Sequence, residues 1–262
     1  MAIRNALDIA WQNEIELNPA LKITFSSELS TMPWDNVKNQ VPSKKGRTDS
    51  LTTLTLTFDF GVPVTVSHAI LTAHNLTATA GVTVEGAADS GFSTSLFTAG
   101  ATVVVGNAII TNFTAISREF WRWSITDSSN SDGYIEAGHA FFGVRDQLEF
   151  LDFGVVWDRI DPALNVRALN GALTSFDRPK FRRTTIPLGS FQQTEHRLLQ
   201  DIFADRGRGK GAYFITDPSS VRDTEGLQRE TVFGTFIQGP TIAHRQSTWH
   251  QPNNMVIEEL HG

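Results

Sequence analysis

The clearest pattern in the chain is an alternation of apolar and polar residues with a period of two. Leu54, Leu56, Phe58 and Phe60 alternate with three threonines and an aspartate in the segment TLTLTFDF. Successive side chains of a strand point to opposite faces, so this spacing predicts a strand with one buried and one solvated face. Further short strands are predicted at VSHAILTAHNL, GVTVEGA, ATVVVGNAII, REFWRWSIT and YIEAGHAFFG. Their spacing is typical of an antiparallel β-sandwich.

A different series of elements begins near residue 147. Four strands are predicted there, at KFRRTTIPL, AYFITD, ETVFGTFI and NMVIEEL. Between the first two lies one predicted helix, 191–206, with Ser190 as the N-cap, Gln193 completing a capping box and Gly207 closing the end. Its apolar side chains share one face, and they are Phe191, Leu198, Leu199, Ile202 and Phe203. This half predicts an α+β domain with one packed helix.

The two patterns predict a chain of two domains. We expect an N-terminal arm or first strand over 1–20, a β-sandwich over 21–146 and the α+β domain over 147–262. Residues 33–50 are polar and rich in residues that break regular structure, so they predict a long loop. Long loops at the end of a sandwich are common binding positions.

Composition excludes several classes of protein and site. The chain has no cysteine, which rules out disulfides, thiolate metal sites and a cysteine nucleophile. A net charge of -6 gives no general attraction for nucleic acid. No apolar stretch is long enough to span a membrane, and charges interrupt the N-terminal segment, so we expect neither an anchor nor a signal peptide.

Two segments resemble ligand-binding loops without the context that such loops need. GRGKG, at 207–211, is glycine-rich and basic like a phosphate loop, but it closes a predicted helix, whereas a phosphate loop opens one. DSSNSDG, at 127–133, resembles the start of a calcium loop, but its twelfth ligand position falls on His139, where a glutamate is needed. We expect a basic connection at the first and a tight turn, with Gly133 at a positive φ, at the second.

No set of residues indicates catalysis or metal binding. His68 and His74 lie nearly 20 Å apart in a predicted strand, at about 3.3 Å per residue, so one ion cannot bridge them. His244 and His250 flank Trp249 without chelating spacing. No pair of carboxylates stands out among Asp35, Asp59, Glu85 and Asp132, and there is no Gly-x-Ser-x-Gly elbow. The sequence therefore predicts a protein that is not an enzyme and holds no cofactor or metal.

The segment from Arg118 to Gly143 resembles the closing strands of a discoidin-like, galactose-binding-type β-sandwich. That family follows an aromatic-basic-aromatic strand with a polar turn and a Gly-Tyr-Ile-Glu strand. FWRW and then GYIE match these in this sequence. The earlier segment FDFGVPVTVSHAILTAHNL is similar to the family's strand pair that ends in His-Asn. The resemblance covers roughly residues 20–145 and implies a jelly-roll sandwich.

The second half looks like the distal-tail class of bacteriophage proteins. The similarity lies in the order of DRPKFRRTTIPL, TEHRLLQDIF, GRGKGAYFITDP and NMVIEEL. Phage tail proteins often carry a discoidin-like module, so the two resemblances together imply a structural component of the tail tip or baseplate of a virion, made in the host cytoplasm. They further imply a homo-oligomer (a ring, trimer or hexamer) with other phage tail proteins as partners, no nucleic acid and no membrane insertion.

Two function hypotheses follow, each with its own candidate residues. The first is a scaffold that assembles with neighbouring tail proteins, and because Arg and Trp dominate interface energetics its candidate contacts are Arg178, Arg182, Arg183 and Trp249. The second is an adhesin for host-surface glycans, with contacts in the loop at Trp34, Asp35, Lys44 and Arg47. An exposed Trp34 would stack on a sugar ring or anchor an interface. A cell-wall hydrolase, the third possibility, lacks a pair of catalytic groups.

Overall fold

The computed structural model describes residues 6–149, 154–167, 173–189, 191–216, 224–238, 242–244, 249–252 and 254–260. The chain is mainly β, with antiparallel strand pairs, as the sequence predicts. It divides into two compact units, which are described one at a time. The larger unit contains Ala6–Leu148 and Ala212–Thr231, and the smaller contains Glu149–Gly211 and Val232–His261 together with residues 1–5.

Two long antiparallel strands form the frame of the larger unit. They are β4 (Thr53–Thr72) and β7 (Ile109–Thr126), and their mutual register shifts between Asp59 and Val64 and again between Val66 and His68. The first half of β4 and the second half of β7 belong to a sheet with the order β2-β4-β7-β5-β6, completed by β2 (Lys22–Phe25), β5 (Gly81–Ala87) and β6 (Phe97–Ala101). The second half of β4 pairs with β9 (His139–Gly143).

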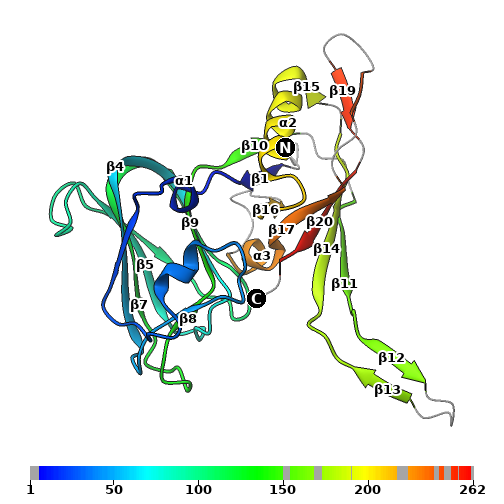
Figure 1. The fold of residues 1–262 in the computed structure, drawn as a ribbon. Helices are drawn as coiled ribbons and strands as arrows, with labels where there is room; N and C mark the ends of the chain where they lie inside the picture. Colours follow the sequence, from blue (N-terminus) through cyan, green and yellow to red (C-terminus); the bar gives the residue numbers. More distant parts are fainter. Residues whose placement is uncertain are drawn as a thin grey trace. The chain divides into compact units, whose positions relative to one another are not determined.

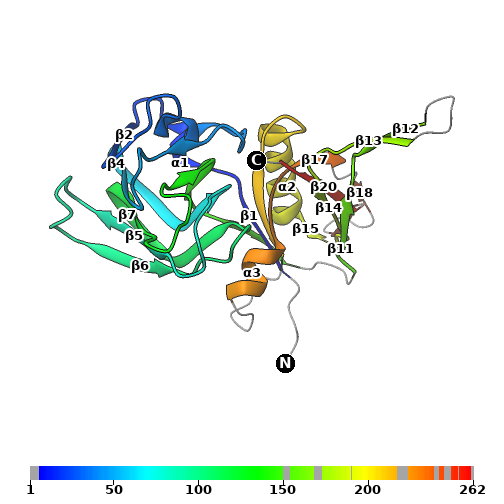
Figure 2. The same cartoon turned by 90° about the horizontal axis from the view of Figure 1, so that it is seen from below.

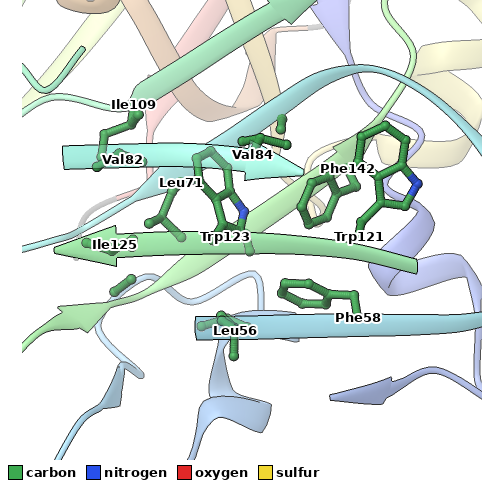
Figure 3. Close-up of a cluster of buried hydrophobic side chains, with 14 of the residues drawn as sticks. Leu56, Phe58, Leu71, Val82, Val84, Ile109, Trp121, Trp123, Ile125 and Phe142 are labelled. Carbon is green, nitrogen blue, oxygen red and sulfur yellow. The ribbon is translucent and has the colours of Figure 1, made fainter. Parts of the chain in front are cut away.

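The period-two pattern of β4 buries its apolar residues as expected. Leu54, Leu56, Phe58 and Phe60 are all at most 2% exposed, and they lie in one core with the tryptophans of β7, Trp121 and Trp123. Figure 3 shows Phe58, Trp121, Trp123 and Phe142 around the same interior space. The ring of Phe142, from β9, lies 5.2 Å from that of Phe58 with their planes at 69°. Such edge-to-face pairs stabilise a core beyond the burial of their area.

One strand of this unit is longer than predicted, and two predicted details of this unit are wrong. VSHAILTAHNL does not begin a strand separate from TLTLTFDF, because β4 continues through Gly61 and Pro63 with a shift of register. ATVVVGNAII is not one strand, since β6 ends at Ala101 and β7 begins at Ile109. The strands on either side of the turn at 127–135 do not pair with each other: β7 pairs with β4 and β5, whereas β8 (Glu136–Ala137) pairs with β3 (Gly46–Arg47).

The first and last strands of the segment Ala6–Leu148 lie in one sheet with a strand from far along the sequence. β1 (Leu7–Ala10) lies between β10 (Asp146–Leu148) and β16 (Ala212–Thr216), antiparallel to both. The short helices of the unit are α1 (Glu14–Leu17), the 3₁₀ turn η1 (Trp34–Lys38) and α3 (Thr224–Glu230). Residues 212–231 thus lie with the first half of the chain.

The smaller unit combines a sheet with one helix. Its strands run in the order β17-β20-β14-β11, with bounds β17 (Thr231–Gln238), β20 (Met255–Glu259), β14 (Phe181–Ile186) and β11 (Val156–Ile160). Helix α2 (Gln193–Arg206) lies beside this sheet (Figure 2), and its Phe203 ring contacts that of Phe236 at 5.4 Å. Two smaller sheets, β12 (Leu164–Arg167) with β13 (Leu173–Phe176) and β15 (Phe191–Gln192) with β19 (Trp249–Pro252) and β18 (Ile242–His244), complete the unit.

The predicted helix is present, but it starts later than expected. It begins at Gln193, and Phe191 belongs to a strand. Gln193 is therefore the first residue of the helix and not the third, so it does not complete the expected capping box. Ser190 lies outside the described residues. The C-terminal prediction is confirmed: Gly207 has a φ of +51° and donates its N–H to the Phe203 carbonyl, because glycine adopts this left-handed conformation without steric cost.

Candidate functional site

Polar side chains gather where three loops of the larger unit meet. The loops follow β2, β4 and β7, and they carry what we call the loop-end cluster: Lys45, Arg47, Asn75, Asp132, Tyr134 and Glu136. Short antiparallel pairing of Gly46 with Ala137 and of Arg47 with Glu136 brings the first and third loops together. The sheet ends therefore place charged and amide groups from distant parts of the sequence on one surface.

Arg47 and Tyr134 form a flat, amphipathic part of this cluster. The guanidinium carbon of Arg47 lies 3.1 Å from the centre of the Tyr134 ring, and both residues are partly exposed. Such stacking is favourable because the ring face is electron-rich and the guanidinium is weakly hydrated. The pair presents planar donors beside an aromatic ring.

Asn75 cross-links two of the three loops. Its side-chain amide donates to the Asp132 carboxylate at 3.0 Å and to the Tyr134 carbonyl at 2.9 Å, and its Oδ1 accepts from the Glu136 N–H at 2.9 Å. Asn130 adds a second link by donating to the carbonyls of Asn75 and Tyr134. The loop conformations are thus held by side-chain hydrogen bonds before any ligand arrives.

An ion pair joins the first loop to β8. Lys45 Nζ lies 2.6 Å from Glu136 Oε1, with the two side chains 25% and 15% exposed. Partial burial reduces solvent screening, so the pair is held more firmly than a fully exposed one.

His74, the residue before Asn75 of the cluster, is held in its neutral form. Burial lowers the pKa of His74 to about 4, although the hydrogen bond to the Asn107 carbonyl opposes that change. Since a carbonyl only accepts, Nε2 carries the proton and donates to it at 2.8 Å, while Nδ1 accepts from the Leu76 N–H at 3.1 Å. The neutral ring satisfies both partners, and a charged ring would lose the second.

The expectation of an exposed Trp34 is wrong. Its side chain is fully buried in the core of the larger unit, and its indole N–H donates to the Ser27 carbonyl at 2.8 Å. The 3₁₀ turn that Trp34 begins directs the ring inward, where a Cβ on Gly46 would lie 2.5 Å from it. Trp34 therefore presents no ring face to a sugar or a partner.

The structure separates the other three glycan candidates. Asp35 is exposed on η1 and pairs with Lys38 at 2.8 Å. Lys44 is exposed in the same loop. Only Arg47 belongs to the loop-end cluster. Asn75, Tyr134 and Glu136 were missed as site residues: GYIE indicated a strand, and no local spacing shows that Asn75 lies beside it.

Two of the candidate assembly contacts are engaged within the chain. Arg182 contacts Glu259 through its backbone N–H, Nε and Nη2, at 3.0, 3.0 and 2.5 Å, and Arg183 contacts Glu258 at 2.8 Å. Both are cross-strand pairs of β14 and β20. Arg178 is exposed, and the side chain of Trp249 lies outside the described part of the structure. The assembly role of these residues stays a prediction.

The weak motifs adopt ordinary structure. Gly207 closes α2, as expected of a basic connection, and Gly133 in the polar turn has a φ of +74°. His68 is buried and His74 partly buried, and burial lowers the pKa of His68 to about 3. Among the described residues, no group of three or more His, Cys, Asp or Glu side chains could hold a metal ion. No helix in the described ranges is long and apolar enough to cross a membrane.

Comparisons with known proteins find similarity in solved structures. No family model matches the chain, and a comparison with curated proteins finds no match. A family 32 carbohydrate-binding module of Clostridium perfringens NanJ, in complex with galactose, is 14% identical, with a TM-score of 0.40 over 52% of this chain and 98% of that one. Chitosan-binding module 1 of a Paenibacillus chitosanase/glucanase is 19% identical, with a TM-score of 0.41 over 51% of this chain and 99% of that one. A Ruminococcus gnavus family 29 fucosidase in complex with fucose is 8% identical, with a TM-score of 0.43 over 52% of this chain and 27% of that one.

Proposed function

We propose that this chain is a non-enzymatic protein that binds carbohydrate at the loop-end cluster. The observation that carries the proposal is the fixed arrangement of planar polar groups beside a partly exposed tyrosine. Arg47 lies on Tyr134, and Asn75 holds the loop that carries Tyr134 through three hydrogen bonds. Sugar hydroxyls need directional donors and acceptors, and groups that are already ordered lose little conformational entropy on binding.

Calorimetric titration tests this proposal. The probes are galactose, GalNAc-β-1,3-galactose and chitosan oligosaccharides, the sugars bound by several of the structurally similar modules. We expect at least one probe to bind, and Arg47→Ala to weaken that binding by at least about tenfold, since a stacked, charge-assisted donor contributes about 1.5–3 kcal/mol. Thermal unfolding of the variant shows whether it remains folded.

Asp35→Ala is the matched control for this titration. Asp35 is an exposed residue of the neighbouring η1 turn, and it forms an ion pair with Lys38 within the same turn. We expect this variant to bind the probe as the unchanged chain does. Equal affinity of the Arg47→Ala variant and the unchanged chain would place any sugar site elsewhere.

The absence of catalysis is part of the proposal. Incubation of the chain with a polysaccharide that it binds should release no new reducing ends. The loop-end cluster supports this because Glu136 is already paired with Lys45 and Asp132 with Asn75. Release of reducing ends that is lost in a Glu136→Gln variant would instead establish a hydrolase.

A second candidate function is that of a structural component of a phage tail tip or baseplate. It is favoured by the order of segments in the second half and by a hairpin of the smaller unit with four exposed apolar side chains, which are Leu164, Val166, Leu173 and Phe176. Exposed apolar groups of this kind mark interaction surfaces. The two functions are compatible, because a tail protein can carry a carbohydrate-binding domain.

Antibody labelling of phage particles in the electron microscope tests the structural role. Gold at the tail tip would support a virion component with other tail proteins as partners. Unlabelled particles from a lysate that contains the chain in free form would contradict it.

A further inference from the structure

The hairpin of β12 and β13 extends the edge of the smaller unit's sheet. The β11–β14 pair runs from Val156↔Thr185 to Ile160↔Phe181, and the chain then continues into the pair Leu164↔Phe176. A short break separates the two pairs, where Lys180 Nζ and Asp161 Oδ2 lie 3.0 Å apart. Figure 1 shows β12 and β13 continuing away from β11 and β14 as a two-stranded ribbon.

The register of the hairpin places three apolar side chains on one face. Leu164 and Phe176 are direct partners, and Val166 lies two residues along from Leu164, so all three point to the same side. Their exposed fractions are 49%, 55% and 46%. Leu173, 60% exposed, pairs with Arg167 and points to the opposite side. The described side chains of the first face, Leu164, Val166 and Phe176, are called the apolar hairpin face.

A two-stranded ribbon of this kind needs a further strand or surface packed against it. A two-stranded hairpin is at best marginally stable in water by itself, and a third strand or a packed surface is required for it to hold its shape. Within the described residues, β12 and β13 pair only with each other. Large side chains that are half exposed side by side also lose the free energy that burial would supply.

We propose that a second copy of this chain covers the apolar hairpin face, by packing its own apolar hairpin face against it. The charge distribution supports this occupant. None of the described side chains on that face of β12 and β13 is charged, the arginine of β12 points to the other side, and Lys180 and Asp161 form an ion pair at the base of the hairpin. Two identical uncharged faces meet without like-charge repulsion, and a two-fold axis allows each to serve as the other's partner. A charged partner surface would instead lose hydration without gaining an opposite charge.

The size of the face determines how strong this association is. Three half-exposed side chains per copy give a buried area well below the roughly 1,200 Å² of a stable interface. The pairing is therefore a weak, concentration-dependent dimer. It lies on a different unit from the loop-end cluster and does not depend on carbohydrate binding.

Sedimentation velocity over a concentration series from about 1 to 300 μM, a range that brackets weak interfaces, tests the proposal. The full chain is compared with a variant that carries Leu164→Ser, Val166→Ser and Phe176→Ser. We expect the weight-average sedimentation coefficient of the unchanged chain to rise with concentration, and the triple variant to have a dimer dissociation constant at least about tenfold higher. Because the three side chains are half exposed, the variant should keep its far-ultraviolet circular dichroism and its melting temperature.

Leu173→Ser is the matched control, since it removes a leucine that is 60% exposed from the opposite face of the same hairpin. It should associate as the unchanged chain does. A chain that stays monomeric to the top of the series, a triple variant that associates equally well, or a control that weakens association as much as the triple variant would each overturn the proposal.

Discussion

At the scale of single residues, the burial of Trp34 is determined by its contacts in the folded chain and not by the polar residues next to it in the sequence. The residues around it, PWDNVKNQVPSKK, are polar, and they indicated an exposed loop. The structure instead has a five-residue 3₁₀ turn that buries Trp34 and Val37 while Asp35 and Lys38 remain at the surface. Trp34 is thus a core residue beneath a loop that carries polar groups.

We expect Trp34→Ala to lower the free energy of unfolding of the larger unit by about 3–5 kcal/mol, because truncation of a buried tryptophan leaves a cavity. Urea unfolding followed by circular dichroism measures the loss. Trp34→Phe, which keeps an aromatic ring, should cost less. An unchanged midpoint in the alanine variant would show that the ring is not packed as described.

Two histidines make the larger unit sensitive to acid. Burial lowers the pKa of His68 to about 3 and that of His74 to about 4, against 6.5 for an exposed histidine. The unfolded chain therefore binds protons below pH 6.5 that the folded chain binds only at much lower pH, so stability is present above pH 6.5 and is lost as the pH falls from there towards 4. For His74 the full change in pKa from 6.5 to about 4 corresponds to about 3 kcal/mol.

Urea unfolding at pH 7.5, 6.0 and 5.0 measures this effect. His74→Gln removes the titrating group, so the variant should lose less stability over this range than the unchanged chain. The comparison of slopes cancels the contribution of the carboxyl groups, which both proteins share. Parallel slopes would mean that His74 is accessible to protons in the folded chain.

At the scale of elements, β14 and β20 are joined by two ion pairs that differ in burial. The side chains of Arg182 and Glu259 are 22% and 16% exposed, whereas those of Arg183 and Glu258 are 38% and 33% exposed. The attraction within an ion pair is screened less by water and salt when the two side chains are more buried. The first pair therefore contributes more to the stability of this sheet than the second.

We expect Arg182→Ala to lower the stability of the smaller unit by about 1–3 kcal/mol, because it removes the two side-chain hydrogen bonds to the partly buried Glu259 carboxylate and keeps only the backbone one of the three. Arg183→Ala, its matched control on the neighbouring position, should cost at most about 1 kcal/mol. Thermal unfolding of the two variants measures the two losses of stability. A larger loss for Arg183→Ala would reverse the assignment.

The sequence predicts strands well where side chains alternate and poorly where the chain is bent. GVTVEGA coincides with β5, and the alternation over Leu54–Phe60 lies within β4. Gly61 has a φ of +70°, yet pairing with β7 resumes at Val64 and carries the strand onward. Local propensity cannot show that a neighbouring strand continues past a bulge.

The candidate site was harder to predict than the strands. Arg47 was singled out from loop composition alone, whereas Asn75 and Glu136, 61 positions apart, meet only through the fold, where Asn75 Oδ1 accepts the Glu136 N–H. Contacts of this kind depend on which strands pair, and a single sequence contains no signal for them.

At the scale of the whole molecule, the larger unit depends on a segment that follows the smaller unit's helix. β16 pairs with β1, and its Tyr213 is fully buried, with its hydroxyl 2.7 Å from His139 Nδ1 and 3.3 Å from Thr72 Oγ1. The other ring nitrogen of His139 lies 3.1 Å from the Glu16 carboxylate. Since that carboxylate accepts, Nε2 donates and Nδ1 accepts from the Tyr213 hydroxyl in the neutral ring.

This arrangement predicts that residues 1–148 are not an independent domain. Without β16, strand β1 would lose one of its two neighbours, and His139 would keep a buried nitrogen with no donor from Tyr213. Unsatisfied buried groups cost about 1–3 kcal/mol each, before the lost packing of the tyrosine ring is added. We expect the 1–148 fragment to melt about 10 °C or more below the larger unit in the full chain.

Tyr213→Phe in the full chain separates the two contributions, because it removes the hydroxyl and keeps the ring that contacts Phe141 at 5.7 Å. Its melting temperature should fall between those of the unchanged chain and the fragment. A fragment as stable as the full chain would mean that β16 adds nothing to the sandwich, and the two halves of the sequence would then fold as the contiguous domains that its pattern suggests. If the fragment is destabilised and the variant lies between, folding of the first half must wait for a segment more than sixty residues downstream.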